Sequence, residues 1–256
     1  MAKSKGSAIL IAIIVITTVA TVVIVATRWF KSTSPSIDDI WVINLDKDTA
    51  RLHDMMGKQN YLPKPIQRWA ATYGREEERR TAELDGVDPI ITKSSKKAEM
   101  DTSSKVLRVG GEVGCWLSHK RVLKHLHKLN VGPDYGHLIL EDDVVIPTDF
   151  TARWNRLRDK IPSDWDVVYL GAGYRNGTRI NSSLLKWKND VELANLGTYA
   201  YLVRHRVLPK LLDKMRHMFA PVDVQYYRTF GDLNVYLLDP PLIEPEPNSI
   251  SNSAVH

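Results

Sequence analysis

The chain has 256 residues, of which 43% are hydrophobic and 25% charged, and these ordinary globular values exclude a disordered or fibrous chain. The formal net charge is +5, but four of these charges flank one apolar N-terminal segment, so the rest of the chain carries +1 (five less four): Lys3, Lys5, Arg28 and Lys31. The basic balance therefore belongs largely to those flanks and predicts no nucleic-acid partner.

Residues 8–27 are uncharged and almost wholly apolar. Their length matches a bilayer core, which needs about 20 residues, and exceeds the roughly 7 to 15 apolar residues of a cleaved signal peptide. We expect an uncleaved transmembrane signal-anchor there, with 1–7 as a short cytosolic tail and 28–37 as a stem. Basic residues on both sides fix the orientation only weakly.

A single-pass type II topology is the simple arrangement, because almost nothing precedes the anchor. The rest of the chain would then lie outside the cytosol, in the lumen of the endoplasmic reticulum or Golgi in a eukaryotic host. Two sequons, at Asn176 and Asn181, fit this location but are common by chance.

Strand-like and helix-like segments alternate through the main domain, which we place at 38–247, before a flexible tail at 248–256. The expected strands are 40–45, 66–72, 137–140, 165–170, 199–203 and 235–238. The expected helices are 49–59, 110–130, 150–160 and 208–218. This alternation predicts an α/β sandwich with a mostly parallel sheet. The polar stretch 75–109 is expected to be a long loop with room for a short helix, and 171–190 is expected to form a hairpin and a loop. Cys115, the single cysteine, is expected to be a small buried residue on a helix.

Glu141, Asp142 and Asp143 directly follow an apolar strand. Three adjacent carboxylates are costly to hold together unless a cation or hydrogen-bond donors balance them. Ligands bind at the carboxyl ends of strands in open α/β sheets, and strand alternation sends Glu141 and Asp143 to one face and Asp142 to the other. Such oxygen ligands suit Mg²⁺ or Mn²⁺. The triplet alone leaves open an acidic turn that only caps the following segment.

Five short segments occur along the domain. They are Val-Ile-Asn-Leu-Asp (42–46) followed by Arg51, Gly-Glu-Val-Gly-Cys-Trp-Leu-Ser-His (111–119), Leu-Ile-Leu-Glu-Asp-Asp-Val (138–144), Gly-Thr-Tyr-Ala-Tyr (197–201) and Pro-Val-Asp (221–223). Together and in this order they resemble glycosyltransferase family 25, the lipooligosaccharide β-galactosyltransferase and procollagen galactosyltransferase family. Each segment alone is weak, whereas five in order are specific and span nearly all of 40–245.

The resemblance implies a GT-A fold, an inverting mechanism and a nucleotide-sugar donor, most often UDP-galactose, with Mn²⁺ or Mg²⁺ as cofactor. It implies metal ligation by Asp143 and Glu141. The expected donor-binding residues are Asn44, Arg51, Glu112, Ser118, His119, Glu141, Asp142, Gly197 and Thr198. Structural roles stay open for several of them: Arg51 as a surface arginine, Glu112 as helix-dipole compensation, His119 as a core histidine, Gly197 and Thr198 as a turn.

Asp223 is the candidate catalytic base, because inverting transfer needs a group that takes the acceptor hydroxyl's proton. The aromatic pair Tyr226 and Tyr227 follows it and could hold a sugar. The alternative is that Asp223 caps a helix starting at 224. Asp166 and Asp239 are rival bases.

The chain departs from the family pattern at two places: Tyr73 replaces an acidic residue, and 75–109 has no clear match. The acceptor therefore stays open between a glycan, as in lipopolysaccharide biosynthesis, and a glycoprotein. Two other functions also stay open. One is a nucleotidyltransferase, which would release pyrophosphate, and the other is a membrane-anchored carbohydrate-binding protein without turnover.

Overall fold

The computed structural model describes residues 34–74, 79–88, 107–173, 177–188 and 197–247. The chain divides into two compact units, Met1–Ser34 and Pro35–His256, and the fold below is that of the second. The expected anchor at 8–27, the tail at 248–256 and Asn176 lie outside the described residues. Within the described ranges, no helix combines the length and the apolar character needed to cross a membrane.

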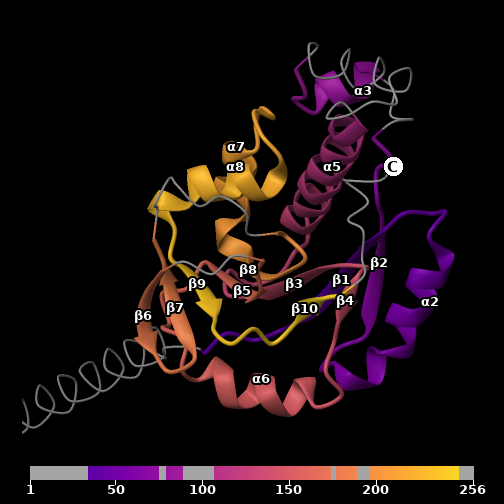
Figure 1. Ribbon diagram of the computed structural model, residues 1–256. Helices are drawn as coiled ribbons and strands as arrows, with labels where there is room; N and C mark the ends of the chain where they lie inside the picture. Colours follow the sequence, from indigo (N-terminus) through magenta and orange to yellow (C-terminus); the bar gives the residue numbers. More distant parts are fainter. Residues whose placement is uncertain (1–33, 75–78, 89–106, 174–176, 189–196, 248–256) are drawn as a thin grey trace, which may run out of the picture. The chain divides into compact units, whose positions relative to one another are not determined.

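One eight-stranded sheet runs through this unit in the order β2-β1-β3-β8-β5-β9-β7-β6 (Figure 1). The strands are β1 (Asp39–Asn44), β2 (Ile66–Ala70), β3 (Gly136–Glu141), β5 (Val167–Gly171), β6 (Gly177–Asn181), β7 (Leu184–Trp187), β8 (Ala200–Arg204) and β9 (Val235–Leu238). Six of the eight run in one direction, and β7 and β8 run against them. The predicted α/β class with a mostly parallel sheet is confirmed.

Helices cover both faces of the sheet (Figure 1). One face carries α2 (Thr49–Gly57) and α6 (Phe150–Arg158), and the other carries α5 (Leu107–His127), α7 (Leu208–Lys214) and α8 (Val222–Thr229). Shorter elements complete the unit: α3 (Arg79–Leu84), a ladder of β4 (Val144–Val145) with β10 (Glu244–Pro245), and 3-10 turns at Gln59–Tyr61, His205–Val207 and Phe230–Asp232.

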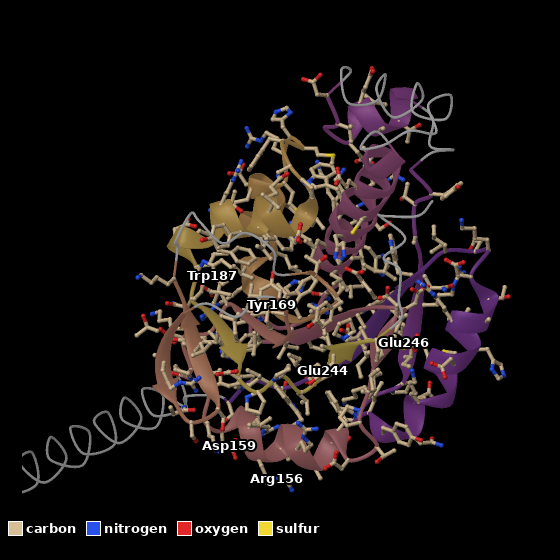
Figure 2. The ribbon with its side chains drawn as sticks, in the orientation of Figure 1. Arg156, Asp159, Tyr169, Trp187, Glu244 and Glu246 are labelled. Carbon is tan, nitrogen blue, oxygen red and sulfur yellow. The ribbon has the colours of Figure 1, made fainter. Side chains whose placement is uncertain are left out.

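Strand alternation divides the core into two apolar clusters. In β1, Trp41 and Ile43 face the cluster under α5, α7 and α8, while Ile40 and Val42 face the cluster over α2 and α6. Every residue of β1 is buried, and this explains the continuous apolar run at 40–43 in the sequence. Arg156 on α6 and Asp159, the residue directly after this helix, are exposed (Figure 2).

The position of β8 is the main departure from a simple strand–helix alternation. It lies between β3 and β5 and pairs antiparallel with both. The Glu141 N–H donates to the Tyr199 carbonyl oxygen at 2.9 Å, so the end of β3 lies beside the start of β8. The segment 197–201 is thereby brought next to the acidic triplet.

Two helix starts differ from the expected ones. Helix α5 begins at Leu107 rather than at 110, so Glu112 and Gly114 lie inside the helix. Their N–H groups are therefore not the free first-turn donors that an anion would meet. Helix α8 begins at Val222 with Pro221 as its N-cap, so Asp223 is a first-turn residue, and its carboxylate accepts from the Val224 N–H at 2.8 Å.

A close crossing of backbones joins α5 to the segment after β2. A Cβ atom added at Gly114 would lie 2.6 Å from the Thr72 carbonyl oxygen and 2.7 Å from the Gly74 nitrogen. Ser118 ties the same two segments, because its hydroxyl accepts from the Thr72 N–H at 2.8 Å and donates to the Gly114 carbonyl at 2.6 Å. Glycine is required here by contact with backbone, not by its φ.

Gly114→Ala should lower the free energy of unfolding by about 1–3 kcal/mol, because overpacking against backbone outweighs alanine's helix propensity. Urea unfolding followed by circular dichroism measures the change. Gly132→Ala is the matched control, since nothing lies within 4 Å of the added Cβ. Equal midpoints for Gly114→Ala and the unmodified chain would contradict the crossing.

Candidate active site

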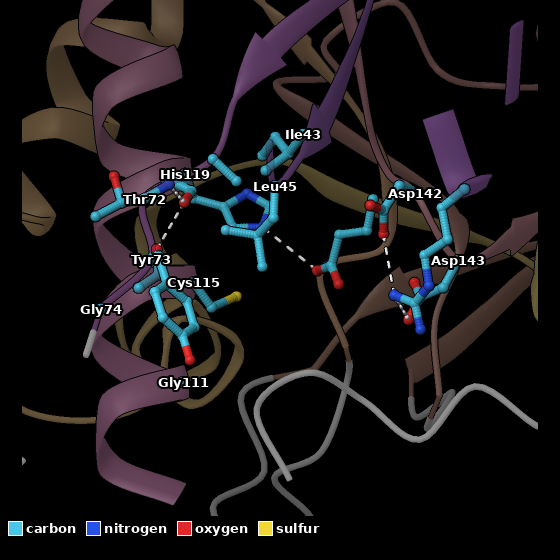
Figure 3. Close-up of a pocket in the computed structure, with 15 residues that line it drawn as sticks. Ile43, Leu45, Thr72, Tyr73, Gly74, Gly111, Cys115, His119, Asp142 and Asp143 are labelled. Atoms are coloured by element: carbon cyan, nitrogen blue, oxygen red, sulfur yellow. Dashed lines mark hydrogen bonds and ion pairs between the residues drawn. The ribbon is translucent and has the colours of Figure 1, made fainter. Parts of the chain in front are cut away.

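A cleft opens at the carboxyl ends of β1, β2 and β3 and is bounded by α5 (Figure 3). The volume of the cleft, including the open space at its mouth, is about 660 Å³. The lining residues come from these four elements, from the loops that follow the strands and, for Arg51, from α2: Ile43, Leu45, Arg51, Ala71, Thr72, Tyr73, Gly74, Gly111, Gly114, Cys115, Ser118, His119, Glu141, Asp142 and Asp143. This is where ligands bind in open α/β sheets.

The acidic triplet lies at one side of this cleft, and each carboxylate has different partners. Asp142 accepts from the Asn44 amide at 2.7 Å and from the Arg51 guanidinium at 3.2 Å. Asp143 lies 3.7 Å from the same Arg51 nitrogen. Glu141 instead meets the residues of α5 and of the segment before β8. The alternation expected from the sequence thus separates Glu141 from Asp142, but Arg51 links both aspartates.

Asn44 is held at the end of β1 by three groups. Its amide nitrogen also donates to the Asp48 carbonyl at 3.0 Å, and its side-chain oxygen accepts from Arg68 Nε at 3.0 Å. Arg68 forms an ion pair with Asp46 as well. The parallel pairing of β1 with β2 puts Val42 opposite Arg68, which carries the guanidinium to this strand end. Arg68 was not among the expected site residues.

His119 is fully buried and bridges the helix to the strand ends. Its Nδ1 lies 2.9 Å from the Tyr201 hydroxyl, and its Nε2 lies 3.3 Å from Glu141 Oε1. Thr198 donates to the same carboxylate oxygen at 2.8 Å. Burial works to raise the pKa of Glu141, but the hydrogen bonds from His119 and Thr198 outweigh it and hold that pKa below its usual value.

Negative charge is least balanced at Asp143. Burial, and then the neighbouring Glu141 and Asp142 carboxylates, raise the pKa of Asp143 to about 7. Burial also raises the pKa of Asp142, although Asn44 and Arg51 oppose it. A divalent cation beside these oxygens would lower both pKa values. Hard carboxylate oxygens with unbalanced charge therefore fit Mg²⁺ or Mn²⁺.

Cys115 is half-buried and lines the cleft, whereas the sequence pattern predicted a residue buried in the core. Figure 3 shows its sulfur and the His119 ring pointing into the cleft from the same helix. Burial, followed by the Glu141 and Asp223 carboxylates, raises the pKa of the Cys115 thiol well above its ordinary value. The thiol is therefore protonated and a poor nucleophile in the free protein.

Asp223 does not line the cleft. Its carboxylate nevertheless helps to raise the pKa of Cys115, which is a lining residue. The two rival bases have other partners. Asp166 precedes β5, at the opposite strand end, and accepts from the Asn234 N–H at 3.0 Å, while Asp239 forms an ion pair with Arg179. Neither rival lines the cleft.

Four other residues that the sequence suggested for the site do not line the cleft. Tyr226 and Tyr227 are buried in the core under α5, α7 and α8, so they offer no open face to a sugar. Glu112 does not line the cleft. Gly197 lies outside it as well, but its φ of +63° favours glycine and turns the chain into Thr198, the donor to Glu141.

The family model described as Glycosyltransferase family 25 (LPS biosynthesis protein) matches residues 37–226. A protein from Anopheles gambiae named "Glycosyltransferase 25 family member" is 25% identical over 168 residues, or 65% of this chain and 26% of that protein. This chain thus spans about a quarter of that relative's length.

The solved apo-form glycosyltransferase GlyE of Streptococcus pneumoniae TIGR4 is similar over 84% of this chain and 56% of that one, with 10% identity. The TM-score is 0.40, too low to establish a shared fold. The family match rests on sequence, includes all five segments that carried the resemblance and covers β1 through most of α8. The chain belongs to glycosyltransferase family 25.

Proposed function

We propose that the protein is an inverting glycosyltransferase that moves a sugar, galactose from UDP-galactose, to a hydroxyl of a glycan or glycoprotein acceptor. The observation that carries this proposal is the acidic triplet at the end of β3, which lines a cleft. The chain's membership of glycosyltransferase family 25 gives that observation its meaning. A GT-A arrangement is part of the same proposal. The family match and the mostly parallel sheet support it.

The donor would lie along the strand ends of β1 and β2. Arg51 supplies a planar guanidinium that suits phosphate or a uracil carbonyl, and the Asp142 carboxylate holds it toward the cleft. Tyr73, at the position of the family's acidic residue, presents a ring with the Lys47 ammonium 4.4 Å from its centre. With Ile43 and Leu45 it forms an apolar wall for a nucleobase.

Asp143 and Glu141 would hold a Mn²⁺ or Mg²⁺ ion, which when bound supplies Lewis-acid stabilisation of the leaving diphosphate. His119 and Thr198 fix the Glu141 carboxylate by hydrogen bonds from two sides. Their donors also keep Glu141 ionised, as the direction of its pKa shift indicates. A rigid, ionised ligand needs little rearrangement when substrate arrives.

Asp223 would take the proton from the acceptor hydroxyl as that oxygen attacks the anomeric carbon. It belongs to α8, so it approaches the cleft from a different element than the donor residues do. Separate elements for donor and base suit an in-line displacement, in which nucleophile and leaving group occupy opposite faces of the sugar. The Asp223 carboxylate lies near enough to Cys115, a cleft residue, to raise the pKa of that thiol.

A screen of UDP-sugars with and without Mn²⁺, read as nucleoside diphosphate release, tests the function. We expect metal-dependent UDP release with UDP-galactose, and a thermal shift with the same donor when no acceptor is present. Pyrophosphate release would instead identify a nucleotidyltransferase. Donor binding without turnover across an acceptor panel would favour the carbohydrate-binding alternative, and no nucleotide-sugar binding would refute the proposal.

Asp143→Asn should reduce metal-dependent turnover by at least about 100-fold, the scale for one group that stabilises transition-state charge. The cause is loss of a carboxylate ligand with little change of volume, so the melting temperature should be retained. Asp159→Asn, at the exposed residue directly after α6, is the matched control and should keep full activity. Unchanged turnover in Asp143→Asn would refute the metal assignment.

Asp223→Asn should lower kcat by about 10²–10⁴-fold, the usual contribution of a general base, and leave the donor KM unchanged. Initial rates over donor and acceptor concentrations separate the two constants. Asp232→Asn, an exposed carboxylate just after the same helix, serves as control. If the donor KM rises while kcat is retained, Asp223 contributes to donor binding and is not the base.

The membrane anchor at 8–27 is also part of the proposal. The full chain should stay in the membrane pellet after alkaline carbonate extraction, whereas a chain beginning at residue 37 should be released. Protease added to sealed vesicles should leave the main domain intact if the topology is type II. Release of the full chain by carbonate would show that the segment is not an anchor.

A further inference from the structure

Three side chains of different chemistry converge at the floor of the cleft. One ligand atom from each of Cys115, His119 and Glu141 lies within 4.8 Å of the other two. Cys115 and His119 are four residues apart on α5 and therefore share one helix face. Glu141 reaches them from the end of β3, with Oε1 only 3.3 Å from His119 Nε2.

The histidine and the carboxylate are already oriented by neighbours that are themselves buried. Tyr201, 1% exposed, holds His119 Nδ1 at 2.9 Å, which leaves Nε2 directed at the other two groups. Thr198, 3% exposed, holds Glu141 at 2.8 Å. Ligating histidines in metalloproteins show this pattern, in which the second ring nitrogen is fixed by an outer partner.

We propose that Cys115, His119 and Glu141 form a site for Zn²⁺, which shares Glu141 with the proposed catalytic metal site but adds a sulfur and a nitrogen ligand. Zinc binds sulfur at about 2.3 Å and imidazole nitrogen at about 2.0–2.1 Å in tetrahedral sites, so ligand atoms lie roughly 3.5 Å apart. The pair formed by His119 and Glu141 already has nearly that separation. On binding, the thiol proton would pass to solvent, and the His119 ring proton would lie on Nδ1, where the Tyr201 hydroxyl can accept it.

The combination of sulfur, nitrogen and oxygen selects the ion. A thiolate favours Zn²⁺ over Mg²⁺ and Mn²⁺, which prefer oxygen ligands. Glu141 belongs to both donor sets, so zinc at this site withdraws a ligand from the catalytic metal. The consequence, which rests on the function proposed above, is inhibition of transfer by zinc in the presence of Mn²⁺.

Binding is tested first without any activity measurement, on the metal-free full chain titrated with Co²⁺. Because the sequence has a single cysteine, a thiolate-to-cobalt charge-transfer band in the near ultraviolet reports Cys115 alone. We expect that band to saturate at one equivalent, with a visible spectrum typical of tetrahedral cobalt, and to vanish when Zn²⁺ is added. Absence of the band at millimolar Co²⁺ would overturn the proposal.

Two variants distinguish metal binding at this site from non-specific metal binding elsewhere on the protein. Cys115→Ser should abolish the charge-transfer band and weaken zinc binding. Tyr201→Phe, which removes only the outer hydroxyl, should retain the band and weaken zinc binding by about 10–100-fold. Zinc affinity is read by competition with a chromogenic chelator, and circular dichroism shows that each variant is folded. Zinc affinity unchanged in Cys115→Ser would overturn the proposal.

Inhibition is tested last, as the ratio of UDP release with and without micromolar Zn²⁺ at fixed Mn²⁺. This ratio should be about 0.1 or lower for the unmodified chain and near one for Cys115→Ser. Equal sensitivity of both proteins would overturn the inhibitory role. A chain with no transferase activity would still give the cobalt spectra, so failure of the function and failure of the zinc site are distinguishable.

Discussion

Three consecutive carboxylates at the end of a buried strand repel one another, and the rest of the site can be understood as the response to that repulsion. Asn44 and Arg51 engage Asp142, while His119 and Thr198 engage Glu141. Asp143 retains the largest imbalance, and its pKa rises to about 7 through burial and its two acidic neighbours. An arrangement that partly neutralises two carboxylates and leaves a third exposed to their field favours a cation beside it.

The fold supplies each of these partners from a different part of the chain. Parallel pairing of β1 with β2 and β3 puts Asn44 and the triplet at one edge. The antiparallel β8 then delivers Thr198 and Tyr201, and α5 delivers His119. Glycine at 114 allows α5 to cross the segment after β2 in backbone contact, and both segments line the cleft.

The strands and the acidic triplet were predictable, because apolar runs of strand length and adjacent charges are local signals. The antiparallel place of β8 was not, because it depends on pairing between distant segments. For the same reason the sequence did not reveal that Cys115 faces the cleft, that Arg68 supports Asn44, or that Tyr226 is buried. Glu112 lies off the face of α5 that lines the cleft, a face formed by Gly111, Gly114, Cys115 and Ser118. Family resemblance brought together residues such as Thr198 that no local pattern links to Glu141.

The most direct test of the proposed charge balance is a crystal structure with Mn²⁺ and UDP, with diffraction data collected at the manganese absorption edge. We expect an anomalous peak at coordination distance, about 2.0–2.3 Å, from carboxylate oxygens of Asp143 and Glu141, with UDP phosphate oxygens bound to the same ion. UDP bound in the cleft with no manganese peak at these carboxylates, or with the peak elsewhere in the protein, would contradict the assignment of the triplet as the metal site.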